Sequence, residues 1–175
     1  MEKKGKATKD VFLHNIRPVK IADLCRFQMP TPLSASASKL EYSGAKGGGI
    51  DILARTGQGR GTCLSVMELK QGQACKATDA AMSQALAYGV FIQELLASEC
   101  GRDWFNIFGF SANQSLNRPR LKVVTVMQYG DTIDQRTGDP MVLDTARGAL
   151  EFHYIYLDNG LEQALRVKSS SIFRK

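Results

Sequence analysis

The chain has 175 residues, of which 43% are hydrophobic and 23% are charged, and these values suit one soluble globular domain with a real core. Its formal net charge of +6 favours an acidic partner, with nucleic acid as the first candidate, although Lys3, Lys4, Lys6 and Lys9 lie in a short basic arm. The four cysteines form no C-x-x-C pair, and the longest apolar run, residues 85–92, is too short to cross a bilayer, so neither a zinc site nor a membrane partner is expected.

The first part of the chain predicts little regular structure. Residues 1–9 are expected to be a disordered basic arm, and residues 10–175 a single domain. A loosely helical pattern over residues 10–27 is interrupted by Pro18. The stretch MPTPLSASAS, residues 29–38, is typical of a linker or loop. No signal peptide is recognised, so the expected location is the cytoplasm.

The middle of the chain predicts three strands and a helix. Residues 39–43, 49–55 and 62–70 read as successive antiparallel strands of a meander, separated by glycine-rich turns. A helical pattern follows over residues 78–98, with an apolar stripe at every third or fourth position: Met82, Leu86, Gly89, Ile92 and Leu96.

The second half predicts four more strands, at residues 104–110, 121–129, 152–157 and 164–173, with a short helix around 142–150. Strands and helices mixed in this way predict an α/β fold in which helices flank a central mixed β-sheet.

The predicted hairpin over residues 49–70 places charged residues among apolar ones. Side chains alternate along a strand, so Glu68 and Lys70 share one face while Leu69 points to the other. A type II′ turn at Gly59-Arg60 pairs residues whose numbers add up to 119. Asp51 then lies opposite Glu68, and Lys70 lies opposite residue 49, which is glycine and leaves space for a substrate.

Two ionised carboxylates about 5 Å apart repel each other by about 3 kcal/mol at an effective dielectric constant near 20. A divalent cation with a preference for oxygen ligands, Mg²⁺ or Mn²⁺, reverses the sign of that interaction. A lysine beside the cation can orient or activate a water molecule, or neutralise charge on a phosphate. The alternative is a cross-strand salt bridge between Asp51 and Lys70, with Glu68 facing solvent.

Asp51, followed by Glu68-Leu69-Lys70 after a hairpin of this length and then by a helix, resembles the PD-(D/E)XK nuclease superfamily, which has the restriction endonuclease-like fold. The resemblance covers residues 10–128 and departs at the proline position, which is Gly49 or Ile50 here. It implies that Asp51 and Glu68 bind the metal, that the Leu69 carbonyl adds a ligand, and that Lys70 assists the attacking water.

The helix after this motif carries Gln84 and Tyr88, four residues apart and therefore on one face. The pair resembles the Q-x-x-x-Y motif of exonuclease-like branches of the superfamily, which implies a role in placing DNA. The alternative is that Tyr88 is a core residue and Gln84 a boundary residue.

Two further sets of charged residues stay open. Asp23 and Glu41 are candidates for an additional acidic ligand, and solvated charge is the simpler interpretation of each. The basic segment NRPRLK, with Arg118, Arg120 and Lys122, either contacts phosphates or is a solvated loop.

The first functional hypothesis is a Mg²⁺-dependent deoxyribonuclease with catalytic residues Asp51, Glu68 and Lys70, acting on DNA or else on RNA. Proteins with restriction-like folds often act as homodimers, so a dimer is one expected assembly. The second hypothesis is an inactive nucleic-acid-binding or assembly module of the same fold. The third is a structural protein with a cross-strand salt bridge.

Overall fold

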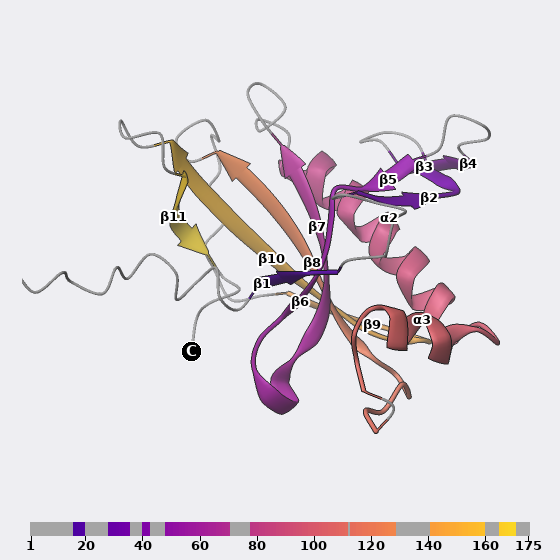
Figure 1. Cartoon of the computed structure of the whole chain (residues 1–175). Helices are drawn as coiled ribbons and strands as arrows, with labels where there is room; N and C mark the ends of the chain where they lie inside the picture. The colour runs from indigo at the N-terminus through magenta and orange to yellow at the C-terminus, as the bar shows by residue number, and fades with distance from the viewer. Residues whose placement is uncertain are drawn as a thin grey trace, which may run out of the picture.

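A seven-stranded mixed sheet forms the centre of this computed structural model, which describes residues 16–19, 28–35, 40–42, 48–70, 78–111, 113–128, 141–159 and 165–170. The strands follow the order β1-β6-β7-β8-β10-β11, and β9 pairs with β10 (Figure 1). Their bounds are β1 (Ile16–Pro18), β6 (Ile52–Thr56), β7 (Cys63–Lys70), β8 (Arg120–Gln128), β9 (Val142–Thr145), β10 (Gly148–Asn159) and β11 (Leu165–Ser170).

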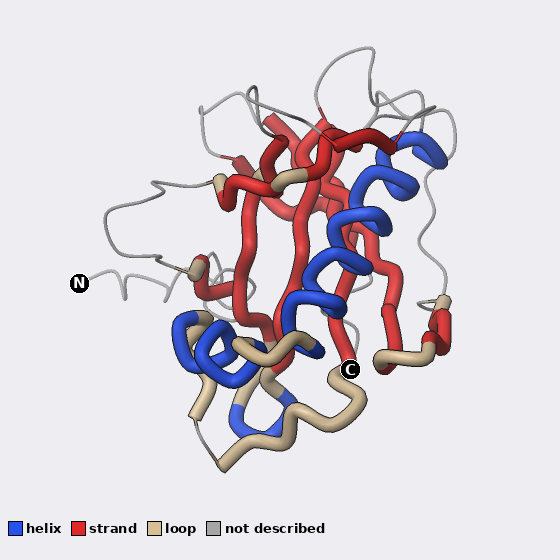
Figure 2. Tube along the Cα trace, turned by 90° about the vertical axis from the view of Figure 1, so that its right-hand side faces the viewer, coloured by secondary structure: helices blue, strands red, loops and turns tan. Residues whose placement is uncertain are grey.

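Two smaller sheets lie beside the main one. One joins β2 (Met29–Thr31) to β5 (Gly48–Ile50), and the other joins β3 (Leu33–Ala35) to β4 (Leu40–Tyr42). Helix α2 (Thr78–Ala97) lies along one face of the main sheet, and α3 (Gly101–Ile107) packs against α2 (Figure 2). None of the helices in these described ranges is both long and apolar enough to cross a membrane.

The sheet is mixed because its centre is parallel and its outer pairs are antiparallel. Strand β8 runs parallel to both β7 and β10, whereas the β1–β6, β6–β7, β9–β10 and β10–β11 pairs are antiparallel. The connection from β7 to β8 contains both helices, as a parallel pair requires. The predicted α/β class with a central mixed sheet is therefore confirmed.

Both faces of the sheet bury apolar side chains, which is why the central strands read as nearly continuous hydrophobic runs. The face under α2 carries Val123 and Leu150, both fully buried. Neighbouring residues along the strands point to the other face, where a second cluster contains Ala54, Met67, Val124, Val126 and Ile155.

The helix predicted at residues 78–98 is confirmed as α2, and its apolar stripe faces the sheet. Met82, Ile92 and Leu96 are buried in the core. Gly89 allows α2 to pack closely on the sheet, because a Cβ atom there would lie 2.7 Å from Val123 Cγ2. The strands predicted at 62–70, 121–129, 152–157 and 164–173 are also confirmed, as β7, β8, β10 and β11.

The register predicted for the hairpin is confirmed, since Ile52 pairs with Met67 and Thr56 with Cys63. The predicted two-residue turn is wrong. Residues 57–62 form a longer loop that contains the 3-10 turn η3 (Gly59–Gly61). Gly57 and Gly59 have φ angles of 88° and 53°, so the loop uses glycine twice in left-handed conformations.

The predicted three-stranded meander over residues 39–70 is wrong. Strand β4 pairs with β3, and β5 pairs with β2, where Gly49 lies opposite Pro30 rather than opposite Lys70. The reason is a bend at Asp51 that separates β5 from β6. The Asp51 carboxylate takes the Leu69 N–H, the group that a continuing antiparallel strand would use.

Two other predictions are corrected in the second half. Residues 104–107 of the strand predicted at 104–110 belong to α3 instead, and Phe108 caps this helix. Trp104 and Phe108 are four residues apart, and their ring centroids are separated by 5.7 Å. Residues 142–150 were expected to be a helix but form β9 and the start of β10. Gly148, with φ at 151°, permits the tight turn between these strands.

Two predictions near the N-terminus also change. Residues 16–18, within the predicted helical region 10–27, form β1 at the edge of the sheet, which is a position that tolerates Pro18. The predicted linker at 29–38 contains β2 and β3. The arm at residues 1–9 lies outside the described residues.

We expect Gly89→Ala to lower the free energy of unfolding by about 1–2 kcal/mol. The methyl group would press on Val123 in a filled core, and this overpacking outweighs the gain of about 1 kcal/mol in helix propensity. Val90→Ala is the control, because Val90 is 42% exposed on the same helix and should change stability by less than about 0.5 kcal/mol. Urea denaturation measures both, and a stabilised Gly89→Ala protein would contradict the close packing of α2 on β8.

Candidate active site

Asp51 lies at the bend between β5 and β6, beside the end of β7. Its Oδ2 accepts a hydrogen bond from the Leu69 backbone N–H at 2.9 Å, and its Oδ1 accepts one from Gln28 Nε2 at 3.1 Å. A carboxylate held through both oxygens has little freedom to rotate. The bend therefore places a fixed acidic group next to the last residues of β7.

Glu68 is the buried acid of the site, with 2% of its surface exposed. Its Oε1 accepts a hydrogen bond from Lys70 Nζ at 2.8 Å. Its Oε2 is buried and has no hydrogen-bond partner among the described residues. An unsatisfied buried carboxylate oxygen is costly, so it indicates a place where a proton or a cation would be stabilised.

The pKa of Glu68 is raised from 4.5 to about 7. Burial is the main cause, because it penalises the charged form. The hydrogen bond from Lys70 opposes this effect, and the negative charge of Asp51 adds to it. Asp51 lies near Glu68 because its carboxylate accepts the backbone N–H of Leu69, the residue that follows Glu68 in β7.

Lys70 joins the acidic pair to helix α2. Its Nζ donates to Glu68 Oε1 and also to Gln84 Oε1 at 2.7 Å, and its side chain is 20% exposed. Gln84 thus fixes the amine from a second element of the fold. The ammonium group sits where solvent reaches it, beside a carboxylate that solvent does not reach.

The two residues of the Q-x-x-x-Y pattern differ in their surroundings. Gln84 is half-buried and contacts Lys70, whereas Tyr88 is 2% exposed and belongs to the main core. The core alternative therefore describes the position of Tyr88. A contact of either residue with DNA stays a prediction.

The residues present fit a divalent cation that prefers oxygen ligands. Asp51 supplies a carboxylate from the bend before β6 and Glu68 supplies one from β7, and Glu68 Oε2 is without a partner among the described residues. A cluster of three or more His, Cys, Asp or Glu side chains is not found in the described ranges. Asp23 lies outside these ranges, and only the backbone of Glu41 falls within them. The Leu69 carbonyl as a ligand stays a prediction.

The salt-bridge alternative needs Glu68 to face solvent, and this requirement is not met. Glu68 is buried and hydrogen-bonded to Lys70. Gln28 is a residue of the site that the sequence did not suggest, because it precedes a stretch typical of a linker. Its partner Asp51 lies 23 residues away, and no spacing rule connects them.

Comparisons with family models, curated proteins and solved structures find no match for this chain.

Glu68→Gln tests the cost of burying this acid. The folded protein has the higher pKa and binds more protons than the unfolded chain between pH 4.5 and about 7, so wild-type stability should fall as the pH rises through this window. The glutamine variant lacks this loss. We expect it to match wild type near pH 4.5 and to be more stable at pH 8.5, by up to about 3 kcal/mol. Urea denaturation at a series of pH values measures the difference.

The control for this series is Glu99→Gln, because Glu99 is exposed and should give the same curve as wild type at every pH. A Glu68→Gln protein that is strongly destabilised at pH 8.5 would show that the ion pair with Lys70 outweighs the cost of burial.

Proposed function

We propose that this protein is a metal-dependent nuclease that hydrolyses phosphodiester bonds in DNA through Asp51, Glu68 and Lys70. The single observation that carries the proposal is the buried Glu68 carboxyl group. One of its oxygens is bound by Lys70, the other has no partner among the described residues, and Asp51 is its acidic neighbour. A perturbed acid beside a second acid and a lysine is typical of a catalytic site.

Asp51 and Glu68 would hold Mg²⁺ or Mn²⁺, which supplies positive charge to polarise a phosphate oxygen and to bind water. The protein holds the two carboxylate ligands in fixed orientations through hydrogen bonds. Asp51 is fixed by the Leu69 N–H and by Gln28, and Glu68 is fixed by Lys70. Ligands that are already oriented lose less entropy when a cation binds.

Lys70 would position the attacking water or stabilise the negative charge that develops on the phosphate. Its hydrogen bonds to Glu68 and to Gln84 hold Nζ at the partly exposed edge of the site. Gln84 is then a positioning residue, because it acts through Lys70. Its amide oxygen has no acid–base role at neutral pH.

DNA is the proposed substrate because the net charge of +6 on the chain attracts a polyanion. The acidic pair alone would repel a polyanion, so positive charge elsewhere on the chain is needed to bind it. Arg118 and Arg120 are exposed and belong to the basic segment. The restriction endonuclease-like fold and the membership of the PD-(D/E)XK superfamily are part of this proposal. The mixed sheet with α2 on its face is compatible with both.

Cleavage assays with Mg²⁺ or Mn²⁺ on single-stranded, linear and circular DNA test the function. We expect Lys70→Ala to lower turnover at least 100-fold while metal binding is retained, because a group that positions or activates water contributes on that scale. Glu68→Ala should remove both turnover and metal binding, as measured by calorimetry. Gln84→Ala and Tyr88→Phe should have smaller effects.

The control for these variants is Glu99→Ala, which removes an exposed carboxylate and should cleave like wild type. Activity that survives in both Lys70→Ala and Glu68→Ala would contradict the catalytic assignment. A wild-type protein that binds nucleic acid but cleaves none of these substrates, nor RNA, would favour the binding or assembly module.

A further inference from the structure

A second polar site lies near the C-terminal end of α2, away from the carboxylates. Gln93 and Gln84 are nine residues apart on this helix, which corresponds to roughly 13 Å along its axis. Gln93 is 2% exposed and lines a cavity of about 190 Å³. A buried side-chain amide needs partners for both its oxygen and its nitrogen.

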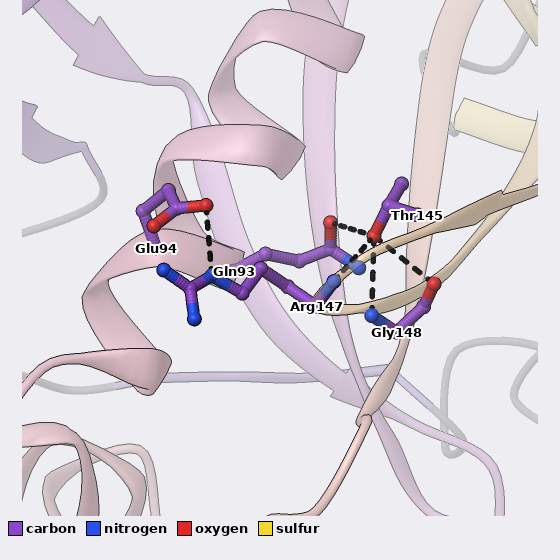
Figure 3. Close-up of polar contacts among 5 residues, drawn as sticks. All are labelled: Gln93, Glu94, Thr145, Arg147 and Gly148. Carbon is purple, nitrogen blue, oxygen red and sulfur yellow. Dashed lines mark hydrogen bonds and ion pairs between the residues drawn. The ribbon is translucent and has the colours of Figure 1, made fainter.

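The oxygen of the Gln93 amide is used by Thr145 (Figure 3). The Thr145 hydroxyl accepts the backbone N–H groups of Arg147 at 3.2 Å and Gly148 at 3.1 Å, which occupy both of its lone pairs. Its single proton must then go to an acceptor. The Gln93 Oε1 and the Gly148 carbonyl oxygen each lie 3.0 Å away. Gln93 therefore presents its oxygen, not its nitrogen, to Thr145.

The nitrogen of the same amide does not take part in the contact with Thr145. Gln93 Nε2 is buried and has no hydrogen-bond partner among the described residues. The cavity that Gln93 lines also contains Asn117, Arg118 and Arg147, and its described lining includes no aspartate or glutamate. The polar lining is thus rich in donors and positively charged, and an acceptor with negative charge is its chemical complement.

The walls of the cavity are held together without a ligand. Arg118 donates to the Thr145 carbonyl oxygen at 3.2 Å, and the Ala149 N–H donates to the Pro119 carbonyl oxygen at 3.3 Å. A Cβ atom on Gly148 would lie 2.2 Å from that Pro119 oxygen, so the β9–β10 turn sits directly on the loop before β8. The two arginines are therefore carried by segments that are fixed to each other.

Arg147 has a competing partner at the rim, since its Nε donates to Glu94 Oε1 at 3.1 Å (Figure 3). Both side chains are about half exposed, at 52% and 55%. Exposed ion pairs of this kind contribute little to stability, so Glu94 holds the Arg147 side chain only weakly. Because Glu94 accepts a hydrogen bond from Nε, the two terminal nitrogens of the Arg147 guanidinium group take no part in this ion pair.

We propose that this cavity binds a phosphate group through Gln93 Nε2 and the guanidinium groups of Arg118 and Arg147. Its volume corresponds to about six water molecules, which is enough for a tetrahedral oxyanion. A phosphate has several acceptor oxygens, so one group can satisfy the buried amide and both arginines together. The site is independent of the metal-dependent activity proposed above.

Calorimetric titration of the full-length protein with inorganic phosphate tests this site, at constant ionic strength and with EDTA to exclude metal-bound phosphate. We expect saturable binding that is weakened about tenfold or more in Arg147→Gln, Arg118→Gln and Gln93→Met. The Gln93 side-chain amide signals in a ¹⁵N NMR spectrum should shift during the titration. If Gln93→Met does not fold, the variants of the exposed arginines still decide the question.

One control makes the result specific. Arg60→Gln removes the same charge from the exposed hairpin loop, so it should bind phosphate like wild type. The absence of saturable binding, or an equal loss in Arg60→Gln, would overturn the proposal. A 5′-phosphorylated oligonucleotide that binds more tightly than its 5′-hydroxyl form would identify the source as nucleic acid, and equal binding would identify free phosphate as the ligand.

Discussion

The hydrogen bond from the Leu69 N–H to the Asp51 carboxylate is the contact on which the candidate active site depends. It ends the antiparallel ladder between β6 and β7, because a side chain takes the donor that a neighbouring strand would otherwise use. The chain before Asp51 is then free to leave the main sheet and to pair with β2 instead. This hydrogen bond therefore holds Asp51 beside Glu68 and also allows β5 to form the small sheet with β2.

Burial gives Glu68 its chemistry, and the surrounding charges adjust it. An acid on the face that packs under α2 is penalised when ionised, and Lys70 recovers only part of that penalty. A well-packed apolar residue would be the simpler choice for stability at this position. The cost is understandable when an external positive charge completes the site, and a metal ion would do so through the oxygen that has no described partner.

The sequence predicted those features that follow from local periodicity. The helix at α2, the strands β7, β8, β10 and β11, and the pairing of Ile52 with Met67 all follow from patterns within a few residues. The failures arise where distant segments decide the structure. The meander was wrong because β2 and β3, which come from an apparent linker, take β5 and β4 as partners. The aromatic run around Phe105 was read as a strand because aromatic residues are common in strands, yet it packs as α3.

The same distinction applies to the polar residues. Asp51, Glu68 and Lys70 could be grouped from the alternation of strand side chains, because the relevant pairing is between neighbouring strands. Gln28 and Gln93 could not, since their partners Asp51 and Thr145 lie 23 and 52 residues away. Gln93 sits in the apolar part of α2, where a sequence pattern predicts only packing. Its side-chain nitrogen has no hydrogen-bond partner among the described residues, because the β9–β10 turn already donates two backbone N–H groups to the Thr145 hydroxyl, which therefore has no lone pair left for the Gln93 amide.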